Sequence, residues 1–239
     1  MGLGVIINGK APISGSKTDK SDTALTEINN DYKYGGSAAD DNSGSLTYVK
    51  ICYAGARSTA DIEHNGLTLN GVGNGTKIEN IYVLESADDA IEFFGGTVNV
   101  TNLLAVNPDD DMFDFTQGYC GTLKNCYGVW ESDYTSTEAD PRGIEADGNM
   151  DGLYPDHLRQ SDFKVENMTI VNNAANTADN VDRMQDSNSR FVAEAKATIT
   201  NALVKGTGGA IDLVDMKDSK GAGNIESSIH ITNTLISQG

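Results

Sequence analysis

The sequence is poor in the residues on which several common protein classes depend. Its 239 residues include only 4 prolines, 1 tryptophan, 6 phenylalanines and 3 cysteines. Three cysteines are too few for a disulfide scaffold, although Cys120 and Cys126 could pair, which would indicate an oxidising compartment. No apolar run approaches the roughly 18–20 residues that a membrane-spanning helix needs. We therefore expect no membrane insertion by this segment.

Basic residues are also scarce. The chain has 17 lysines and arginines against 35 acidic residues, which gives a formal net charge of −18. Because phosphate groups would be repelled, a nucleic acid or an anionic membrane is not an expected partner. Cations and neutral glycans remain as candidates.

Turn-forming residues, in contrast, are abundant. The sequence has 26 glycines, 24 aspartates and 22 asparagines. These residues form tight turns, and asparagine and aspartate tolerate left-handed backbone angles. This composition argues against a helical bundle.

An internal repeat predicts the architecture. Residues 75–96 align with residues 97–118, and both segments are 22 residues long. Each copy alternates apolar and polar residues over short stretches separated by turns, which is typical of short half-buried strands. Further copies follow, so the repeat predicts an all-β parallel β-helix of about seven coils, with residues 1–239 forming one domain.

Each copy has an asparagine between two apolar strand segments. We expect the amides of stacked asparagines to hydrogen-bond along the helix axis and to satisfy backbone groups at a buried bend. The asparagines of this column are Asn80, Asn102, Asn125, Asn167, Asn201 and Asn233.

These turns and strands resemble the right-handed parallel β-helix families, such as pectate lyases and polygalacturonases. Residues 4–13, 41–56 and 65–118 are similar to a family of secreted or outer-membrane-anchored bacterial β-helix proteins, mostly without assigned function. The resemblance implies a right-handed coil and an extracellular or outer-cell-surface location. Members of that family carry further coils upstream, so this chain is expected to be a segment of a longer protein.

One face of the coil is expected to be acidic. In the recurring strand, the residue between two inward apolar side chains points outward. The outward positions are Ile6, Thr68, Glu92, Asp114, Glu145, Asp182 and Asp212. Three residues before the last five of these stand Asp89, Asp111, Arg142, Asp179 and Gly209. Arg142 is thus expected between Asp111 and Asp179.

Stacked carboxylates repel one another, so a cation, a shared proton or an arginine must offset the repulsion. A Ca²⁺ ion takes 6–8 oxygen ligands, and a site between coils would suit it. The candidate ligands are Asp88, Asp89, Glu92, Asp110, Asp111 and Asp114. The alternative is a solvated acidic face without a metal.

The resemblance also implies a catalytic alternative, because polygalacturonases keep catalytic aspartates and a basic residue on this face. The candidates here are Asp111, Asp114, Arg142 and Glu145. The chain lacks the G-H-G and R-I-K motifs of polygalacturonases, which counts against this alternative. Long insertions, including residues 10–44 and 148–161, are expected to build a groove over this face. Trp130, Tyr134, Tyr154 and His157 could stack on a glycan there or pack under the loops.

Three functions follow as hypotheses. The first is an extracellular structural or adhesive scaffold that binds polysaccharide or other surface proteins and is stabilised by calcium. The second is a polysaccharide lyase or glycoside hydrolase that uses the acidic groove. The third is a fibre subunit that associates end to end through the apolar strands at residues 5–7, 229–231 and 235–236.

Overall fold

The regular structure of the chain is almost entirely β. The computed structural model describes residues 4–55, 64–138, 141–174, 190–192, 195–206 and 228–238. The strands are β1 (Val5–Asn8), β2 (Thr23–Leu25), β3 (Lys33–Gly35), β4 (Ser45–Cys52), β5 (Leu67–Asn70), β6 (Lys77–Leu84), β7 (Ile91–Phe94), β8 (Asn99–Val106), β9 (Phe113–Thr116), β10 (Thr122–Trp130), β11 (Ile144–Asp147), β12 (Asp162–Asn172), β13 (Arg190–Val192), β14 (Lys196–Thr200), β15 (Leu203–Gly206), β16 (Ser228–Thr232) and β17 (Leu235–Gln238). A short 3-10 helix, η1, spans Met150–Gly152. In the described part, no helix has the length and apolar character needed to cross a membrane.

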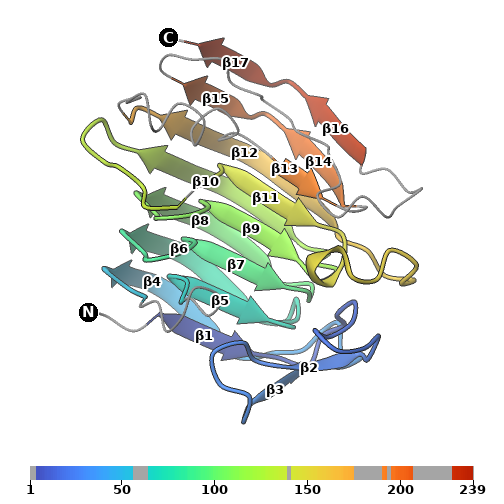
Figure 1. The fold of residues 1–239 in the computed structure, drawn as a ribbon. Helices are drawn as coiled ribbons and strands as arrows, with labels where there is room; N and C mark the ends of the chain where they lie inside the picture. Colours follow the sequence, from blue (N-terminus) through green and yellow to red (C-terminus); the bar gives the residue numbers. More distant parts are fainter. Residues whose placement is uncertain are drawn as a thin grey trace.

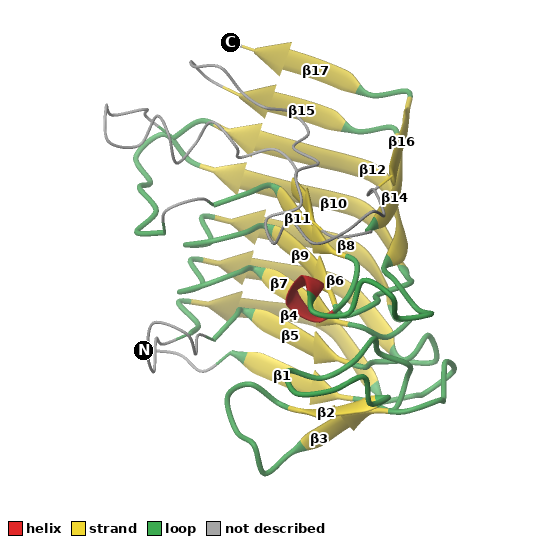
Figure 2. Cartoon of the chain, turned by 45° about the vertical axis from the view of Figure 1, so that its right-hand side comes forward, coloured by secondary structure: helices red, strands yellow, loops and turns green. Residues whose placement is uncertain are grey.

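Two parallel sheets form the body of the coil (Figures 1 and 2). The first has six strands in the order β1-β5-β7-β9-β11-β13. The second has nine strands, with β16-β14-β12-β10-β8-β6-β4 along its length and β15 and β17 paired beside them. The strands β2 and β3 form a separate antiparallel hairpin at the N-terminal end. This arrangement confirms the predicted parallel β-helix.

The long strands of the nine-stranded sheet bend at the asparagine column. Each of these asparagines has a left-handed φ between 50° and 58°. The Asn102 amide donates to Asn80 Oδ1 at 2.8 Å, and Asn125, Asn167 and Asn201 continue the ladder in the same way at 2.9–3.2 Å. The ladder forms as predicted, but the expectation of a buried bend is wrong. Asn102 and Asn125 are exposed, because the left-handed residue turns its side chain outward while the next residue points into the core.

The strand β4 departs from this pattern. Tyr48 lies opposite Asn80 in the register and also has a left-handed φ of 56°. Tyr53, just after β4, has a φ of 53°. A left-handed backbone costs an ordinary L-residue roughly 1–2 kcal/mol. Tyr48 is 85% exposed and Tyr53 is 59% exposed, so core packing does not offset this cost.

The core contains a stack of aromatic rings. The rings of Phe93 and Phe115 lie 5.2 Å apart between centroids, and those of Phe115 and Phe163 lie 4.1 Å apart. Tyr119 packs 4.3 Å from Phe93 and donates its hydroxyl to the Val98 carbonyl. Phe93 and Phe115 occupy equivalent positions of successive coils, so they lie one above the other in the interior.

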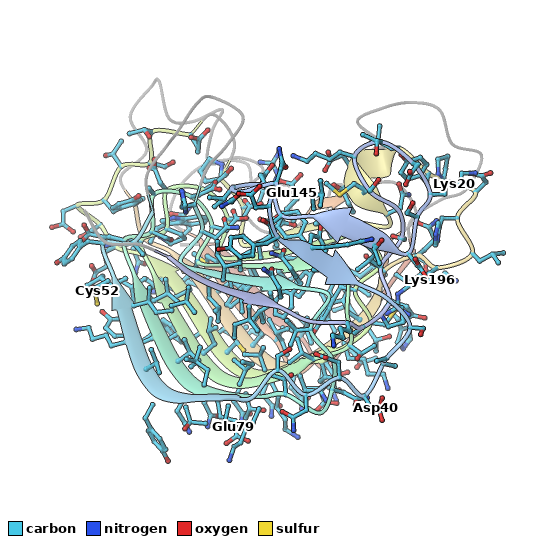
Figure 3. All side chains as sticks on the ribbon, turned by 90° about the horizontal axis from the view of Figure 1, so that it is seen from below. Lys20, Asp40, Cys52, Glu79, Glu145 and Lys196 are labelled. Carbon is cyan, nitrogen blue, oxygen red and sulfur yellow. The ribbon has the colours of Figure 1, made fainter. Side chains whose placement is uncertain are left out.

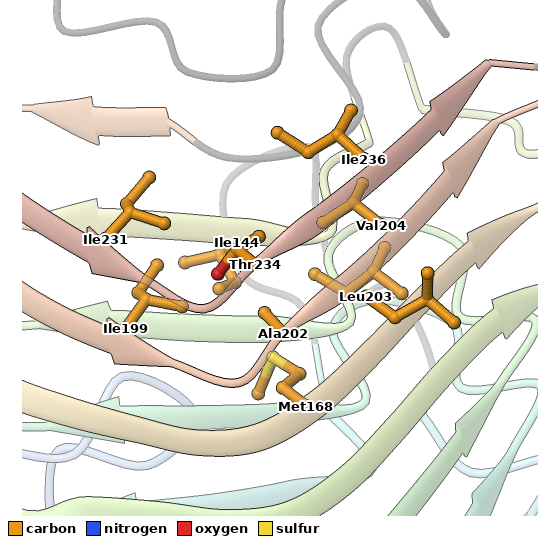
Figure 4. A pocket seen from close by; sticks show the side chains of 10 residues that line it. Ile144, Met168, Ile199, Ala202, Leu203, Val204, Ile231, Thr234 and Ile236 are labelled. Carbon is orange, nitrogen blue, oxygen red and sulfur yellow. The ribbon is translucent and has the colours of Figure 1, made fainter.

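A small apolar pocket opens in the core toward the C-terminal end (Figure 4). Its volume is about 30 Å³, and it lies among β12, β14, β15, β16 and β17. Its lining is apolar except for Thr234. We assign this pocket to the core, because a ligand site of ordinary size occupies about 300–1,000 Å³ and carries several polar groups.

Two sequence expectations need correction. The strand that follows β11 in the six-stranded sheet is β13, and Arg190 pairs with Glu145. The prediction that Asp182 occupies this position is therefore wrong, because the insertion after β12 is longer than the repeat allows. Asp179, Asp182 and Asp212 themselves lie outside the described residues. All three cysteines are free, so Cys120 and Cys126 do not form a disulfide.

The asparagine ladder generates a first prediction. Replacing Asn102 with alanine should lower the free energy of unfolding by roughly 1–3 kcal/mol, because it removes two amide hydrogen bonds and leaves alanine in a left-handed position. Asn102→Gly should cost less, since glycine adopts a positive φ without strain. Urea unfolding measures both values. Asn74→Ala, at an exposed turn outside the ladder, is the control, and equal stabilities for all three variants would contradict the ladder.

Candidate functional site

The outward face of the six-stranded sheet carries a row of carboxylates. The register places Ile6, Thr68, Glu92, Asp114 and Glu145 side by side on successive strands. In Figure 3 Glu145 lies on this side of the coil, whereas Glu79 and Cys52 lie on two other sides. The described residues therefore contain the first five positions of the predicted row.

The turns that precede these strands form a second column. Asp89 Oδ1 accepts the backbone N–H of Asp111 at 2.9 Å, and Asp111 Oδ1 accepts the backbone N–H of Arg142. The Arg142 carbonyl accepts the N–H of Met112 at 2.9 Å. Arg142 thus lies next to Asp111, as the repeat predicted. Because Arg142 is only 3% exposed, its side chain belongs to the interior of this region rather than to an open surface.

Five of the six predicted metal ligands come together. Single carboxylate oxygens of Asp88, Asp89 and Asp110 lie within 4.8 Å of one another, and the same is true of Asp89, Glu92 and Asp114. Asp89 belongs to both groups and so links them. Asp111, the sixth predicted ligand, lies outside both groups and holds the turn at Arg142.

Burial raises the pKa of four of these carboxyl groups well above the ordinary range. For Asp89, desolvation is the largest cause, followed by the charges of Asp88 and Asp114. Desolvation also raises the pKa of Glu92 and Asp114, and each of them lies close enough to other acids for repulsion to add to the effect. Each group therefore favours a bound proton or a nearby cation over a bare negative charge.

Asp111 shares a hydrogen bond with Glu145. Desolvation is the largest cause of its raised pKa, the charges of neighbouring acids come next, and this side-chain bond contributes as well. A hydrogen bond between two carboxyl groups requires a proton on one of them. The pair can therefore hold and release a proton at the acidic face.

Asn65 completes the cluster from the turn before β5. Its amide Nδ2 donates to Glu92 Oε2 at 2.5 Å and to Thr68 Oγ1 at 3.2 Å. Asn65 is 3% exposed, and its Oδ1 has no hydrogen-bond partner among the described residues. The sequence reasoning missed this residue, although it stands three residues before Thr68 as Asp89 stands before Glu92.

A pocket of about 620 Å³ lies beside the acidic row. One wall comes from β2, β3 and the residues around them, but not from Asp31 or Tyr32 at the hairpin turn. Asn70, Phe94, Gln117 and Met150 form the other wall. Tyr34 donates its hydroxyl to Gln117 Oε1 at 2.7 Å and so ties the hairpin to the sheet. Hydroxyl, amide, aromatic and lysine side chains all line this space.

Lys17 brings a positive charge close to the acidic row, in addition to the buried Arg142. Lys17 forms an ion pair with Glu27. Burial alone would lower the pKa of Lys17, but the hydrogen bond to Glu27 and the charges of Asp151 and Glu92 raise it overall. One lysine by itself cannot neutralise the row, because Glu92, Asp114 and Glu145 lie in it and the buried Asp89 and Asp111 lie beside it.

The predicted stacking residues are largely structural. Trp130 is fully buried and donates its Nε1 to the Pro108 carbonyl at 2.9 Å. Tyr134 bonds Asp109 Oδ1 at 3.1 Å, and Tyr154 packs against the small apolar cluster under the hairpin. His157 bonds the backbone of Arg159. Packing under loops accounts for these four residues.

The spacing of Asp89, Glu92 and Asp114 argues against one kind of catalytic pair, that of an inverting hydrolase. An inverting hydrolase keeps its two carboxyl groups about 6.5–9.5 Å apart to admit water. Asp89, Glu92 and Asp114 are closer than that, with oxygens within 4.8 Å. Oxygens this close suit a shared cation or a shared proton better than a water-activating pair.

The comparisons with known proteins identify one family. A family model described as a pectate-lyase-like β-helix domain matches residues 2–238. No curated protein and no solved structure matches the chain.

The buried carboxyl groups generate a second prediction. Since a carboxyl group with a raised folded-state pKa binds its proton more tightly in the folded protein, protonation stabilises the fold. In EDTA, stability should thus be full below the ordinary pKa near 4 and should fall as the pH rises through the raised values. Melting temperatures measured from about pH 4 to pH 8 test this.

The variant Asp114→Asn should reduce the loss of stability at high pH, because asparagine fills the same space without charge. Asp31→Asn, an exposed position on the hairpin, should leave the pH profile unchanged. A wild-type melting temperature that rises with pH over this range would contradict the assignment.

Proposed function

The chain belongs to the pectate-lyase-like β-helix family, and from this premise we propose that it is an extracellular scaffold that binds polysaccharide at a calcium-stabilised acidic face. The family links the chain to polysaccharides at a general level. The observation that carries the finer proposal is the cluster of partly buried carboxylate oxygens within 4.8 Å of one another. A pocket of about 620 Å³ lies near it and is lined by Phe94, two residues after Glu92 in β7.

Calcium suits this cluster for three reasons. Asp89, Glu92 and Asp114 offer hard oxygen ligands, which Ca²⁺ prefers. The unpartnered Oδ1 of Asn65 is a further oxygen beside Glu92. A divalent cation would also remove the repulsion that raises the pKa of these groups.

The pocket beside the cluster supports polysaccharide binding. Phe94 lines it with an apolar ring, and Asn70 lines it with an amide. The hydroxyl groups of Ser16, Thr18 and Thr23 line the opposite wall. Sugar rings have an apolar face and a rim of hydroxyl groups, so this combination matches them chemically.

An extracellular location is consistent with the proposed metal. Extracellular calcium modules bind with dissociation constants of about 10⁻⁴–10⁻³ M, whereas tighter sites serve the cytosol. A site assembled from side chains of separate coils, with no contiguous calcium loop, fits the weaker class. The rigid stack of coils would then act as a scaffold that presents the acidic face.

Calcium should stabilise the protein at neutral pH. We expect added Ca²⁺ to raise the melting temperature at pH 7.5 and to have little effect near pH 4, where protons occupy the same oxygens. The double variant Glu92→Gln/Asp114→Asn should lose the calcium response. Differential scanning calorimetry with EDTA and calcium measures this, and Asp31→Asn should respond like the wild type. An identical calcium response in the double variant would refute this site.

Polygalacturonate is a suitable glycan probe, because its carboxylates would be repelled by the bare acidic face. It should bind in calcium and not in EDTA, as measured by isothermal titration calorimetry. Calcium stabilisation without glycan binding would leave the metal site standing and refute the glycan-binding role.

An enzyme is the second candidate function. The hydrogen-bonded pair Asp111–Glu145 and the raised pKa of Asp114 support it, because a carboxyl group with a raised pKa keeps its proton to higher pH and can act as a general acid. Arg142, the predicted basic member, is buried, which weakens the case for a lyase base at this position.

Activity assays separate the two candidates. If the face is catalytic, the purified protein should release reducing ends or unsaturated products from polygalacturonate or a neutral polysaccharide. Asp114→Asn should then lower the rate at least 100-fold, on the order of the contribution of one general acid. Activity that survives removal of both Asp111 and Asp114 would clear these residues of a catalytic role.

A further inference from the structure

On the outer surface of the nine-stranded sheet, the polarity of the side chains changes at the asparagine ladder. Here 'before' and 'after' mean the N-terminal and C-terminal sides of the ladder asparagine along each strand. Before the ladder, its outward positions are polar, as in the ion pairs Lys77–Glu79 and Lys124–Glu166. After the ladder, the outward positions are mainly apolar. A column there runs through Lys50, Tyr82, Leu104, Tyr127, Thr169, Leu203 and Leu235 in the register.

This column, with the exposed Tyr48 and Tyr53 beside its first member, forms what we call the tyrosine strip. Tyr127 is 42% exposed and Leu104 is 37% exposed. The Lys50 amine lies 4.8 Å from the centre of the Tyr82 ring and adds a hydrogen-bond donor. The strip lies on a different side of the coil from the acidic row, as the positions of Cys52 and Glu145 in Figure 3 show.

The left-handed tyrosines indicate that the strip is more than a by-product of packing. Asparagine occupies the equivalent bend in the later coils, and it would suit the left-handed angle better than Tyr48. Tyr48 and Tyr53 are nevertheless aromatic, strained and highly exposed. A ligand that contacts aromatic faces would account for all three properties.

The shape of the strip and the charge of the protein indicate which kind of ligand the strip can bind. Successive strands lie about 4.8 Å apart, so the strip is roughly 30 Å long and 7 Å wide. Its area is on the order of 200 Å², well below the about 800 Å² that each partner buries in a stable protein complex. A narrow linear surface fits an extended chain of sugar rings, and the net charge of −18 disfavours an acidic chain.

We propose that the tyrosine strip is a second glycan-binding surface, which takes an extended neutral β-linked polysaccharide along the axis of the coil. Tyr82 and Tyr127 lie two strands apart, about 10 Å, so both rings can stack on one chain. The strip uses neither the acidic row nor calcium. It would let the scaffold hold a neutral glycan on one side and a calcium-bound ligand on another.

The test uses the full chain with cellohexaose and chitohexaose in isothermal titration calorimetry, and with microcrystalline cellulose in a depletion assay. At least one probe should bind the wild type. Tyr82→Ala/Tyr127→Ala should weaken that binding at least 10-fold, and Tyr82→Phe/Tyr127→Phe should retain it because phenylalanine still stacks. Tyr32→Ala is the matched control, since Tyr32 is 59% exposed at the distant hairpin.

Several outcomes would overturn the inference. The inference fails if the wild type binds none of the three probes, or if Tyr82→Ala/Tyr127→Ala binds as tightly as the wild type. It also fails if Tyr32→Ala loses binding. A wild type that sediments as a dimer while the alanine variant sediments as a monomer would assign the strip to a second copy instead. Binding should persist in EDTA, so a failure of the proposed calcium site and a failure of the strip are distinguishable. Circular dichroism verifies that each variant is folded.

Discussion

Stacking of successive coils at about 4.8 Å is the constraint on which the rest of the structure depends. It forces each residue to lie beside the equivalent residue of the next coil, so side chains form columns. Where the column is apolar, as in Phe93 and Phe115, the result is a close-packed core. Where it is asparagine, the result is a ladder of amide hydrogen bonds. Where it is acidic, the same spacing produces repulsion that some other group must offset.

The acidic face therefore lowers the stability of the fold, and it also provides groups that can bind a proton or a cation. Burial and mutual repulsion hold Asp89, Glu92, Asp111 and Asp114 at raised pKa values. Backbone hydrogen bonds stabilise part of this charge, since the Asp89 and Asp111 carboxylates accept N–H groups from the following coil. Glu92 and Asp114 lie in the row itself, and their oxygens lie within 4.8 Å of an oxygen of Asp89. Asp89 therefore both holds a turn and belongs to the oxygen cluster.

The coil offers different surfaces because one strand pattern can change along its length. The outward positions of the long strands are charged before the asparagine bend and mainly apolar after it. Each surface extends over several coils through the same stacking rule. A solenoid can thus carry two independent linear surfaces without any change in its core.

The repeat in the sequence determined the parallel β-helix, the asparagine column and the acidic row from Glu92 to Glu145, because columns follow directly from the period. It could not locate β13, since an insertion breaks the period and Arg190 takes the place expected for Asp182. It also could not show that the ladder is exposed, that Trp130 is buried or that Cys120 and Cys126 remain free. Only the tertiary structure decided which carboxylate oxygens lie close together and that Asn65 bonds to one of them. It also decided that the β2–β3 hairpin forms one wall of a pocket. These features depend on contacts between distant segments, and the geometry of such contacts is not encoded in the local alternation of apolar and polar residues.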